Sequence, residues 1–409
     1  MTAKSTKPAR ARYVAGVHPE TSALMNVLAS AGVTAPHTGE PYTEGMLLGV
    51  GGGLAFNYHT FQYKGWTPTL YVSGRYLLQD NVAFLQGACK RLGVGTEIQE
   101  ASSPGAAEKK LAAALESGPA AAWVDLASFS YSGLPPFLQR MMYYVVYVAG
   151  VDASRGVAQV GDTLCPKLIE VTPAELTRAR AAIPAQKFRL LCVKPPAAPI
   201  AAKDLAKAIR EGIQLCCGAA NKARTWNNRI EGIGRWAELL TSDTKEGWPR
   251  IFVPGAPLLM GLGRAYTWIE LFGTGGGLMR GLYADFLEEG GQVLKLKPLG
   301  EVARRYRELA KRWSRFARSC LPDGVPLLAE ARALLDRHVK ALRQKGAAAQ
   351  PELHKGLERL RAIRKSVEEK FPLDDAAVRE LLAGLQGQLS AIAQGEAEAV
   401  EALRAAVSK

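Results

Sequence analysis

The chain has 409 residues, of which 48% are hydrophobic and 22% are charged, a composition typical of globular proteins that bury a sizeable core. The length predicts two or three domains, and the composition excludes a wholly disordered chain. The longest apolar run, residues 141–151, is far shorter than the roughly 20 residues that a membrane-spanning helix needs, so we expect no transmembrane segment.

The first dozen residues are basic and no apolar segment follows them. We therefore expect residues 1–12 to form a disordered basic tail and not a secretory signal. The six cysteines show no C-x-x-C spacing, and the five histidines do not cluster in the sequence. This pattern is typical of a reduced, cytoplasmic protein, and it favours neither a disulfide framework nor a metal site. We expect no metal and no cofactor.

The first region, residues 13–183, opens with predicted helices. A helix is expected to begin at Pro19, because proline at the first helical position loses no hydrogen bond and apolar residues follow at helical spacing. A second helix should begin at Thr43 and Glu44 and run into the glycines at 49–53. Two further helices are expected over residues 82–92 and 106–116.

Strands are predicted to follow these helices. Residues 120–126 have a strand-like pattern, and the apolar run at 141–151 predicts a buried strand that pairs with residues 157–162. The turn at 152–156 makes this pair antiparallel. Helices followed by an antiparallel sheet indicate an α+β fold and not the alternation of a doubly wound nucleotide fold.

The rest of the chain is predicted to be mainly helical. We expect a helical second domain over residues 184–320, with a glycine-rich turn, and a helical C-terminal extension over 321–409. Helix breaks are expected at 321–324, 346–351 and 371–372. In the extension, a heptad-like stripe could pair two copies of the chain or be buried within one copy. The stripe consists of Leu353, Leu357, Leu360 and Ile363.

Net charge is +14, and residues 304–318 are strongly basic. Tyr306, Leu309, Trp313 and Phe316 recur through this segment at helical spacing, which indicates an amphipathic helix with one basic face. The basic face could be an ordinary solvated surface or could bind an acidic protein partner. Nucleic acid ranks behind both interpretations, because only the charge supports it.

Two glycine-rich segments invite a ligand-binding interpretation. Residues 49–53 partly mimic a dinucleotide-binding turn, but a helix precedes them and nucleotide binding is disfavoured. Residues 273–277 run into a predicted helix, so Gly275, Gly276 and Arg280 could bind an anion, while close helix packing explains the same glycines. No hydrolase motif occurs, and Cys216 and Cys217 are better explained as buried thiols than as nucleophiles.

Several motifs resemble a known family, in the same order. They are VHPETSAL at residues 17–24, TEGMLLGVGGGLAF at 43–56 and CKRLGV at 89–94. They are similar to the N-terminal part of the butirosin biosynthesis protein H family. FGTGGGLMRGLYADFL at 272–287 resembles the helical domain of unknown function that usually follows it. The likeness covers roughly residues 13–320.

The resemblance implies a papain-like cysteine-peptidase-type fold, and an acyltransferase that takes an aminoacyl group from a carrier-protein thioester. It also implies a cysteine at the head of the first helix, a histidine on a later strand and an acid or amide on the next strand. This chain has Pro19 in the cysteine position and Tyr144 in the histidine position, or Tyr143 if the register shifts by one. Asp162 alone fits the family pattern.

Two hypotheses of function follow. In the first, the protein forms an amide or ester without a cysteine, with His18 as base and Glu44, Tyr144 and Asp162 in the same site. The acyl donor would be an acidic acyl carrier protein with its phosphopantetheine thioester, and the acceptor a small amine or alcohol. In the second, the protein is a pseudoenzyme that binds a ligand or partner.

Candidate ligand-binding residues are Pro19, His59, Gly275, Gly276 and Arg280. Purely structural roles stay open for three of the candidates. His18 could cap or pack the first helix, Glu44 could be an ordinary first-turn acid, and His59 could be a loop or core residue.

Overall fold

A computed structural model of the chain describes residues 12–75, 81–135, 138–140, 142–194, 196, 198–222 and 225–408, apart from the side chains of 81 and 219–222. The predicted basic tail, Arg12 excepted, and Met141 of the predicted strand lie outside these residues. The chain forms two compact units, each built from separate segments. The first contains Met1–Leu47, Leu85–Leu205 and Leu342–Gln350, and the second contains Leu48–Phe84, Ala206–Ala341 and Pro351–Lys409. The predicted linear boundaries at residues 183 and 320 stay predictions.

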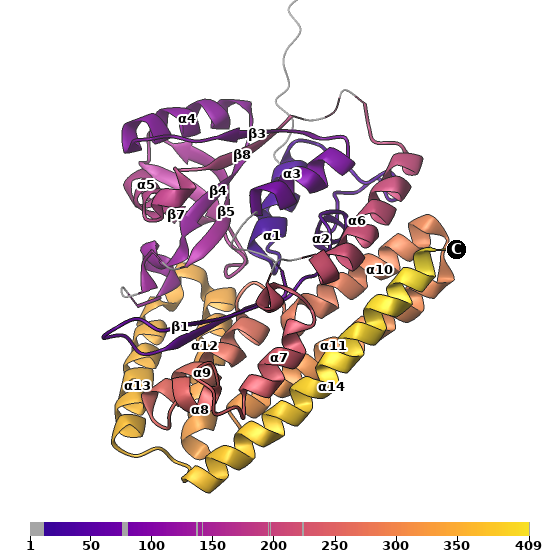
Figure 1. The fold of residues 1–409 in the computed structure, drawn as a ribbon. Helices are drawn as coiled ribbons and strands as arrows, with labels where there is room; N and C mark the ends of the chain where they lie inside the picture. The colour runs from indigo at the N-terminus through magenta and orange to yellow at the C-terminus, as the bar shows by residue number, and fades with distance from the viewer. Residues whose placement is uncertain are drawn as a thin grey trace, which may run out of the picture. The chain divides into compact units, whose positions relative to one another are not determined.

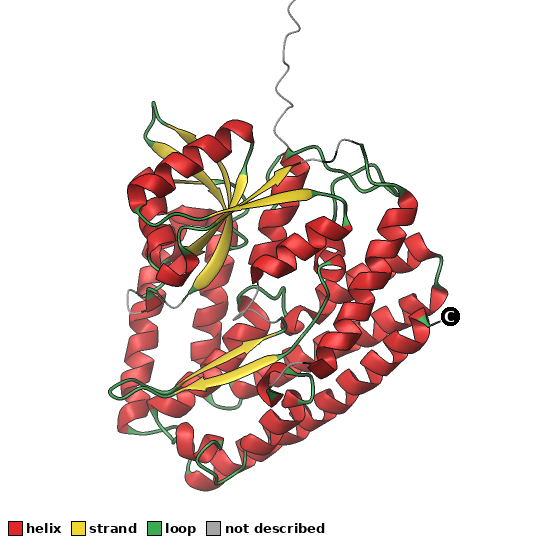
Figure 2. Cartoon of the chain, turned by 45° about the horizontal axis from the view of Figure 1, so that its top comes forward, coloured by secondary structure: helices red, strands yellow, loops and turns green. Residues whose placement is uncertain are grey.

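The first unit is built on a six-stranded sheet in which every pair of neighbours is antiparallel. In spatial order its strands are β3 (Gly95–Gln99), β8 (Leu190–Lys194), β4 (Ala120–Asp125), β5 (Tyr143–Asp152), β6 (Val157–Gly161) and β7 (Ile169–Val171). The strands fan out with a strong twist (Figure 2). The predicted strands β4, β5 and β6 are confirmed, and so is the α+β class. The sequence did not predict β3, β7 or β8.

Helices cover both faces of this sheet. Figure 1 shows α1 (Pro19–Ser30) on one side and α4 (Pro104–Ser117) and α5 (Pro173–Ala181) on the other. Strand β4 is buried along its whole length, because neither of its faces is left to solvent. The predicted helices are all present, since α2 (Glu44–Val50) and α3 (Asn81–Arg91) form as well.

The second unit is mainly helical and also contains the two-stranded antiparallel ribbon of β1 (Asn57–Phe61) and β2 (Thr69–Ser73) (Figure 2). It contains α7 (Gly232–Leu239), α8 (Trp248–Ile251), α9 (Ala256–Tyr266), α10 (Arg280–Leu294), α11 (Lys297–Cys320) and α14 (Asp375–Val407), and most of α6 (Ala202–Lys222), α12 (Pro326–Lys345) and α13 (Gln350–Glu369). All three predicted helix breaks are confirmed by the ends of α11, α12 and α13.

The core of the second unit is an aromatic cluster. The ring of Trp236 lies 5.2–6.4 Å, centroid to centroid, from the rings of Phe56, Trp248, Trp313 and Phe316. Trp313 and Phe316 come from α11, whose apolar face is buried as its periodicity predicts. Such clusters bury large apolar areas, so they hold α7, α8 and α11 together.

The glycines at the end of α2 are sites of close packing within the second unit. A Cβ atom on Gly49 would lie 2.1 Å from the ring of Phe286, and one on Gly51 would lie 2.0 Å from the ring of Phe84. Only glycine allows these rings so close to the backbone. Packing therefore accounts for the motif that partly mimics a dinucleotide-binding turn.

The leucine stripe of α13 also packs within the chain. Leu353 and Ile363 are buried, and Ile363 belongs to a small core cluster with Ala331 and Leu334 of α12. Within the described ranges, no helix is both long enough and apolar enough to cross a membrane.

Candidate functional site

The head of α1 carries a proline in the position where the family resemblance implies a cysteine. Pro19 is the first residue of the helix, and His18 precedes it as the N-cap in an extended conformation. The proline ring suits this helix start because its missing N–H would find no partner there. It offers no nucleophilic atom.

His18 is enclosed by polar side chains. Its Nδ1 lies 2.9 Å from the hydroxyl oxygen of Thr21, and its Nε2 lies 3.0 Å from Oε2 of Glu20. The Thr21 hydroxyl donates to Oε1 of Glu44 at 2.9 Å. His18 is only 2% exposed. Both ring nitrogens therefore face groups of the protein itself.

Glu44 ties the segment before α1 to the start of α2. Its carboxylate accepts hydrogen bonds from the backbone N–H of Val17 at 2.8 Å, from that of His18 at 2.7 Å, and from Thr21. Burial raises the pKa of Glu44, and these hydrogen bonds oppose the rise. A Cβ atom on Gly16 would lie 2.5 Å from Oε2 of Glu44, so glycine is needed for this approach.

Asp162 lies just past the end of β6, at the centre of a second buried cluster. Its Oδ2 accepts from the hydroxyl of Tyr131 at 2.6 Å, and its Oδ1 accepts from the hydroxyl of Tyr144 at 3.0 Å and from the N–H of Leu164 at 2.9 Å. Tyr144 also bonds to Thr163. The structure thus brings together the two residues that the resemblance assigns to the histidine and acid positions. The alternative residue, Tyr143, is 52% exposed.

The electrostatics of this cluster oppose acid–base catalysis at neutral pH. Burial raises the pKa of Asp162, while its three donors oppose the rise. Burial and the neighbouring Asp162 charge raise the pKa values of Tyr131 and Tyr144 well above 10. A hydroxyl with so high a pKa stays protonated and donates, so Tyr144 cannot replace an imidazole as the base.

Tyr13 adds a third hydroxyl beside Asp162. It donates to the backbone oxygen of Asp162 at 2.8 Å, and its ring stacks on Tyr147 with centroids 6.0 Å apart. A Cβ atom on Gly161 would lie 2.4 Å from the Tyr13 ring. The segment before α1 is thus anchored on the sheet next to the Asp162 cluster.

No cysteine has the environment of a reactive thiol. Burial raises the pKa of all six thiols, and it raises the values of Cys89 and Cys217 to about 12. Cys165 lies near Asp162, whose negative charge raises the pKa of this thiol further. A catalytic thiol needs the opposite environment, one that lowers its pKa. Cys216 and Cys217 are buried, as predicted.

The other candidate residues belong to the second unit. His59 lies in β1, where Asn227 and Asn228 contact its two ring nitrogens at 3.1 and 3.3 Å, and burial lowers its pKa. In the glycine-rich turn, the N–H of Gly276 donates to the Thr274 hydroxyl. The buried Arg280 pairs with Glu396.

These contacts favour a structural explanation of the glycine-rich turn. A Cβ atom on Gly277 would lie 2.7 Å from the backbone of Ala310, and the N–H of Gly277 donates to Glu270 at 3.0 Å. Within the described residues, no group of three or more His, Cys, Asp or Glu side chains is placed to hold a metal ion. Four residues in these contacts were not predicted from the sequence as site residues: Glu20, Thr21, Tyr131 and Glu396.

Two family models match the chain. One is described as butirosin biosynthesis protein H, N-terminal, and matches residues 18–163. The other is a domain of unknown function, DUF4872, and matches residues 174–349. The chain belongs to the butirosin biosynthesis protein H family. This membership relates it to specialised metabolism. Helix α14 lies outside both matched segments. A search of curated proteins finds no match to the chain.

Proposed function

We propose that this family member is a pseudoenzyme with a papain-like N-terminal domain, and that it binds an acidic acyl carrier protein without transferring the acyl group. The Asp162 cluster carries the proposal. In a Cys-His-Asp site the acid accepts a hydrogen bond from the imidazole and orients it. In this chain the Asp162 carboxylate accepts instead from the hydroxyls of Tyr131 and Tyr144 and from the N–H of Leu164.

The head of α1 supports the same proposal. Pro19 has no nucleophilic atom, and the neighbouring His18 contacts Glu20 and Thr21 through its ring nitrogens. A base that is 2% exposed has little access to a substrate proton. These residues stabilise the start of α1.

An acidic partner is supported by the net charge of +14 and by the exposed face of α11. Between residues 301 and 318, two acids accompany six exposed cations on that face, and one of the acids, Glu308, has its pKa lowered by Lys311, Arg312 and Arg315. The six cations are Arg304, Arg305, Lys311, Arg312, Arg315 and Arg318. A face with an excess of positive charge attracts an acidic partner and speeds its association.

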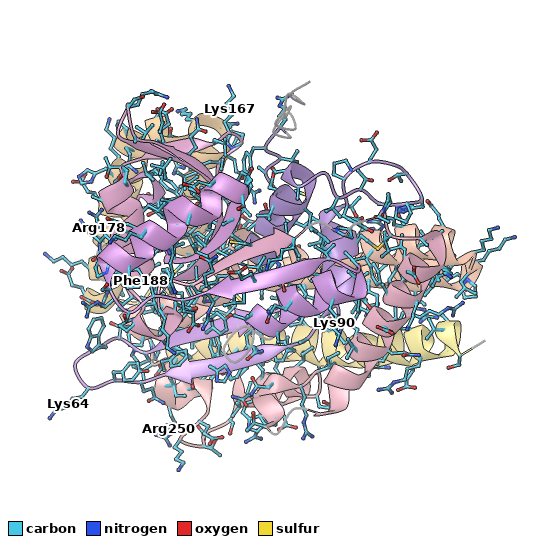
Figure 3. The ribbon with its side chains drawn as sticks, turned by 90° about the horizontal axis from the view of Figure 1, so that it is seen from above. Lys64, Lys90, Lys167, Arg178, Phe188 and Arg250 are labelled. Atoms are coloured by element: carbon cyan, nitrogen blue, oxygen red, sulfur yellow. The ribbon has the colours of Figure 1, made fainter. Side chains whose placement is uncertain are left out.

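Further exposed cations lie elsewhere on the molecule, for example Lys64, Lys90, Lys167 and Arg250 (Figure 3). Substituting these cations provides a control for substitutions on α11, because it shows whether binding of the acidic partner depends on the α11 face or only on total charge. A reduced, cytoplasmic setting is part of the proposal, and all six cysteines are free thiols.

The proposal is tested with an acyl-loaded carrier protein, a panel of amines and alcohols, and intact-mass detection. We expect the carrier to keep its acyl group at the rate of buffer alone, and to bind with an affinity that falls as salt is raised. Acyl loss that depends on the protein contradicts the pseudoenzyme. Absence of binding at low salt contradicts the carrier-binding role.

The contact between His18 and Glu20 favours one second candidate, acyl transfer without a cysteine. An imidazole next to a carboxylate is the arrangement of a general base and the group that orients it. Under this candidate His18→Gln abolishes the acyl loss, while His59→Gln, a histidine of the second unit, retains it.

Nucleic acid is tested as a competitor for the carrier protein, and displacement at stoichiometric amounts favours a nucleic-acid-binding role.

A further inference from the structure

The second unit contains a buried carboxylate that is held by two donors from different helices. Oε1 of Glu396 accepts from Nε of Arg280 at 2.6 Å and from Nε1 of Trp313 at 2.8 Å. Arg280 begins α10 and Trp313 lies in the middle of α11. All three side chains are fully buried, so these contacts are not screened by water.

Arg280 also has contacts outside α14. Its Nη1 donates to the backbone oxygen of Leu278 at 2.8 Å, and its guanidinium carbon lies 5.5 Å from the centroid of the Trp313 ring. Leu278 and Met279 have left-handed backbone conformations, with φ of 52° and 69°. Such conformations are costly for residues other than glycine and are common at ligand clamps. The turn and α11 therefore contribute to the orientation of Arg280.

The carboxylate is supplied by a helix with a suitable apolar stripe. Five apolar residues of α14 recur at spacings of three and four, and Glu396 occupies the remaining position in their stripe. A Cβ atom on Gly395 would lie 3.0 Å from Leu309 of α11, so glycine lets the two helices approach closely next to Glu396. The five are Leu385, Leu389, Ile392, Ala399 and Leu403.

The fit of the carboxylate is incomplete. Among the described residues, neither Nη2 of Arg280 nor Oε2 of Glu396 has a hydrogen-bond partner. A buried donor and a buried acceptor on the same pair are costly to leave unmatched. A carboxylate that is free to rotate could accept a hydrogen bond from Nη2 with its second oxygen.

We propose that Arg280 and Trp313 form a carboxylate-binding site, that Glu396 is its internal ligand, and that a small free carboxylate binds there once the Glu396 side chain is truncated. The site is independent of the proposed carrier-protein role. The ligand class is a monocarboxylate the size of formate or acetate, because that is the group that Glu396→Ala removes.

The test compares Glu396→Ala with Glu396→Gln in the full chain. We expect Glu396→Ala to lower Tm by roughly 10 °C, because it leaves a buried cation unpaired. Formate or acetate should restore part of this loss, with a dependence on concentration that chloride at equal ionic strength lacks. Glu396→Gln keeps the space filled, so it should not respond to either anion.

Matched controls separate binding from a general salt effect. The wild-type chain and Glu398→Ala, an exposed acid on the same helix, should show the same Tm in formate and in chloride. If Glu396→Ala is not recovered folded, its refolding yield from urea is compared in formate and in chloride, and the proposal predicts a higher yield in formate. An equal response of Glu396→Ala to formate and chloride overturns the proposal, as does an equal gain by Glu396→Gln.

Discussion

Two buried carboxylates, one in each compact unit, are stabilised in different ways. Asp162 is 2% exposed and accepts from two tyrosine hydroxyls and one backbone N–H, all of them neutral donors. Glu396 is fully buried and accepts from a guanidinium and an indole N–H. Asp162 is thus surrounded by neutral dipoles, whereas Glu396 is paired with a group of opposite charge.

The two kinds of partner have different physical consequences. Neutral donors only partly offset the cost of burying a charge, so the pKa of Asp162 is raised. A buried ion pair is instead sensitive to the loss of either partner, because the remaining charge is left in an apolar core. The ion pair is therefore best tested by mutating one partner, and Asp162 is best tested by changing the pH.

The largest effect is expected for the ion pair. Arg280→Met or Glu396→Leu alone should each lower the free energy of unfolding by about 3–5 kcal/mol. The double variant should lose much less than the sum, because it leaves no unpaired charge. Chemical denaturation of the four chains measures this coupling. The exposed pair Arg235 and Glu238 is the control and should show near-additive losses. Additive losses at Arg280 and Glu396 would mean that the pair does not interact.

A pH dependence is expected for Asp162. Its raised pKa means that the folded chain binds this proton more tightly than the unfolded chain does, so the stability contributed is present below the unfolded pKa and is lost as pH rises through the folded pKa. Asp162→Asn removes this dependence. It also costs about 1–3 kcal/mol, since its NH2 group faces a tyrosine hydroxyl that needs an acceptor.

The measurement for Asp162 is the difference in Tm between wild type and Asp162→Asn from pH 4 to pH 7. The wild-type advantage should shrink as pH rises. An advantage that grows with pH would show that the pKa of Asp162 is lowered in the folded chain, and that burial does not dominate over the three donors.

A smaller effect is expected at Tyr144. Tyr144→Phe removes one of three donors to Asp162 and should cost about 1 kcal/mol. Tyr131→Phe, which removes the donor to the other carboxylate oxygen, is the matched comparison. Neither change should alter acyl retention on a loaded carrier protein. A change in acyl loss on Tyr144→Phe alone would assign Tyr144 a catalytic role.

Much of this architecture follows from local sequence patterns. Pro19 and the stripe after it predict α1, and the Tyr- and Val-rich run predicts β5. The strands β3 and β8 were missed, because each is short and they pair with each other across about ninety intervening residues, which no local periodicity records. The hairpin of β1 and β2 was missed as well, since residues 57–61 lack a strict apolar alternation.

The candidate site was predictable to a similar extent. The family resemblance predicted that Tyr144 and Asp162 would lie together, but Tyr13 reaches Asp162 from 149 residues away and no motif marks that contact. The buried position of Glu396 could have been predicted from the sequence. An acid within an otherwise apolar heptad stripe requires a buried partner, and Arg280 follows the glycine-rich turn that packs against α11.

The smallest effect on stability is expected on the exposed face of α11. Arg312→Glu together with Arg315→Glu should leave Tm nearly unchanged, because exposed charges contribute little to folding. The same double variant should weaken carrier-protein binding about tenfold at low salt, since charges at an interface act mainly through attraction at a distance. Lys167→Glu with Lys90→Glu reverses equal charge on the first unit (Figure 3). If that control weakens binding as much, total charge and not the α11 face attracts the partner.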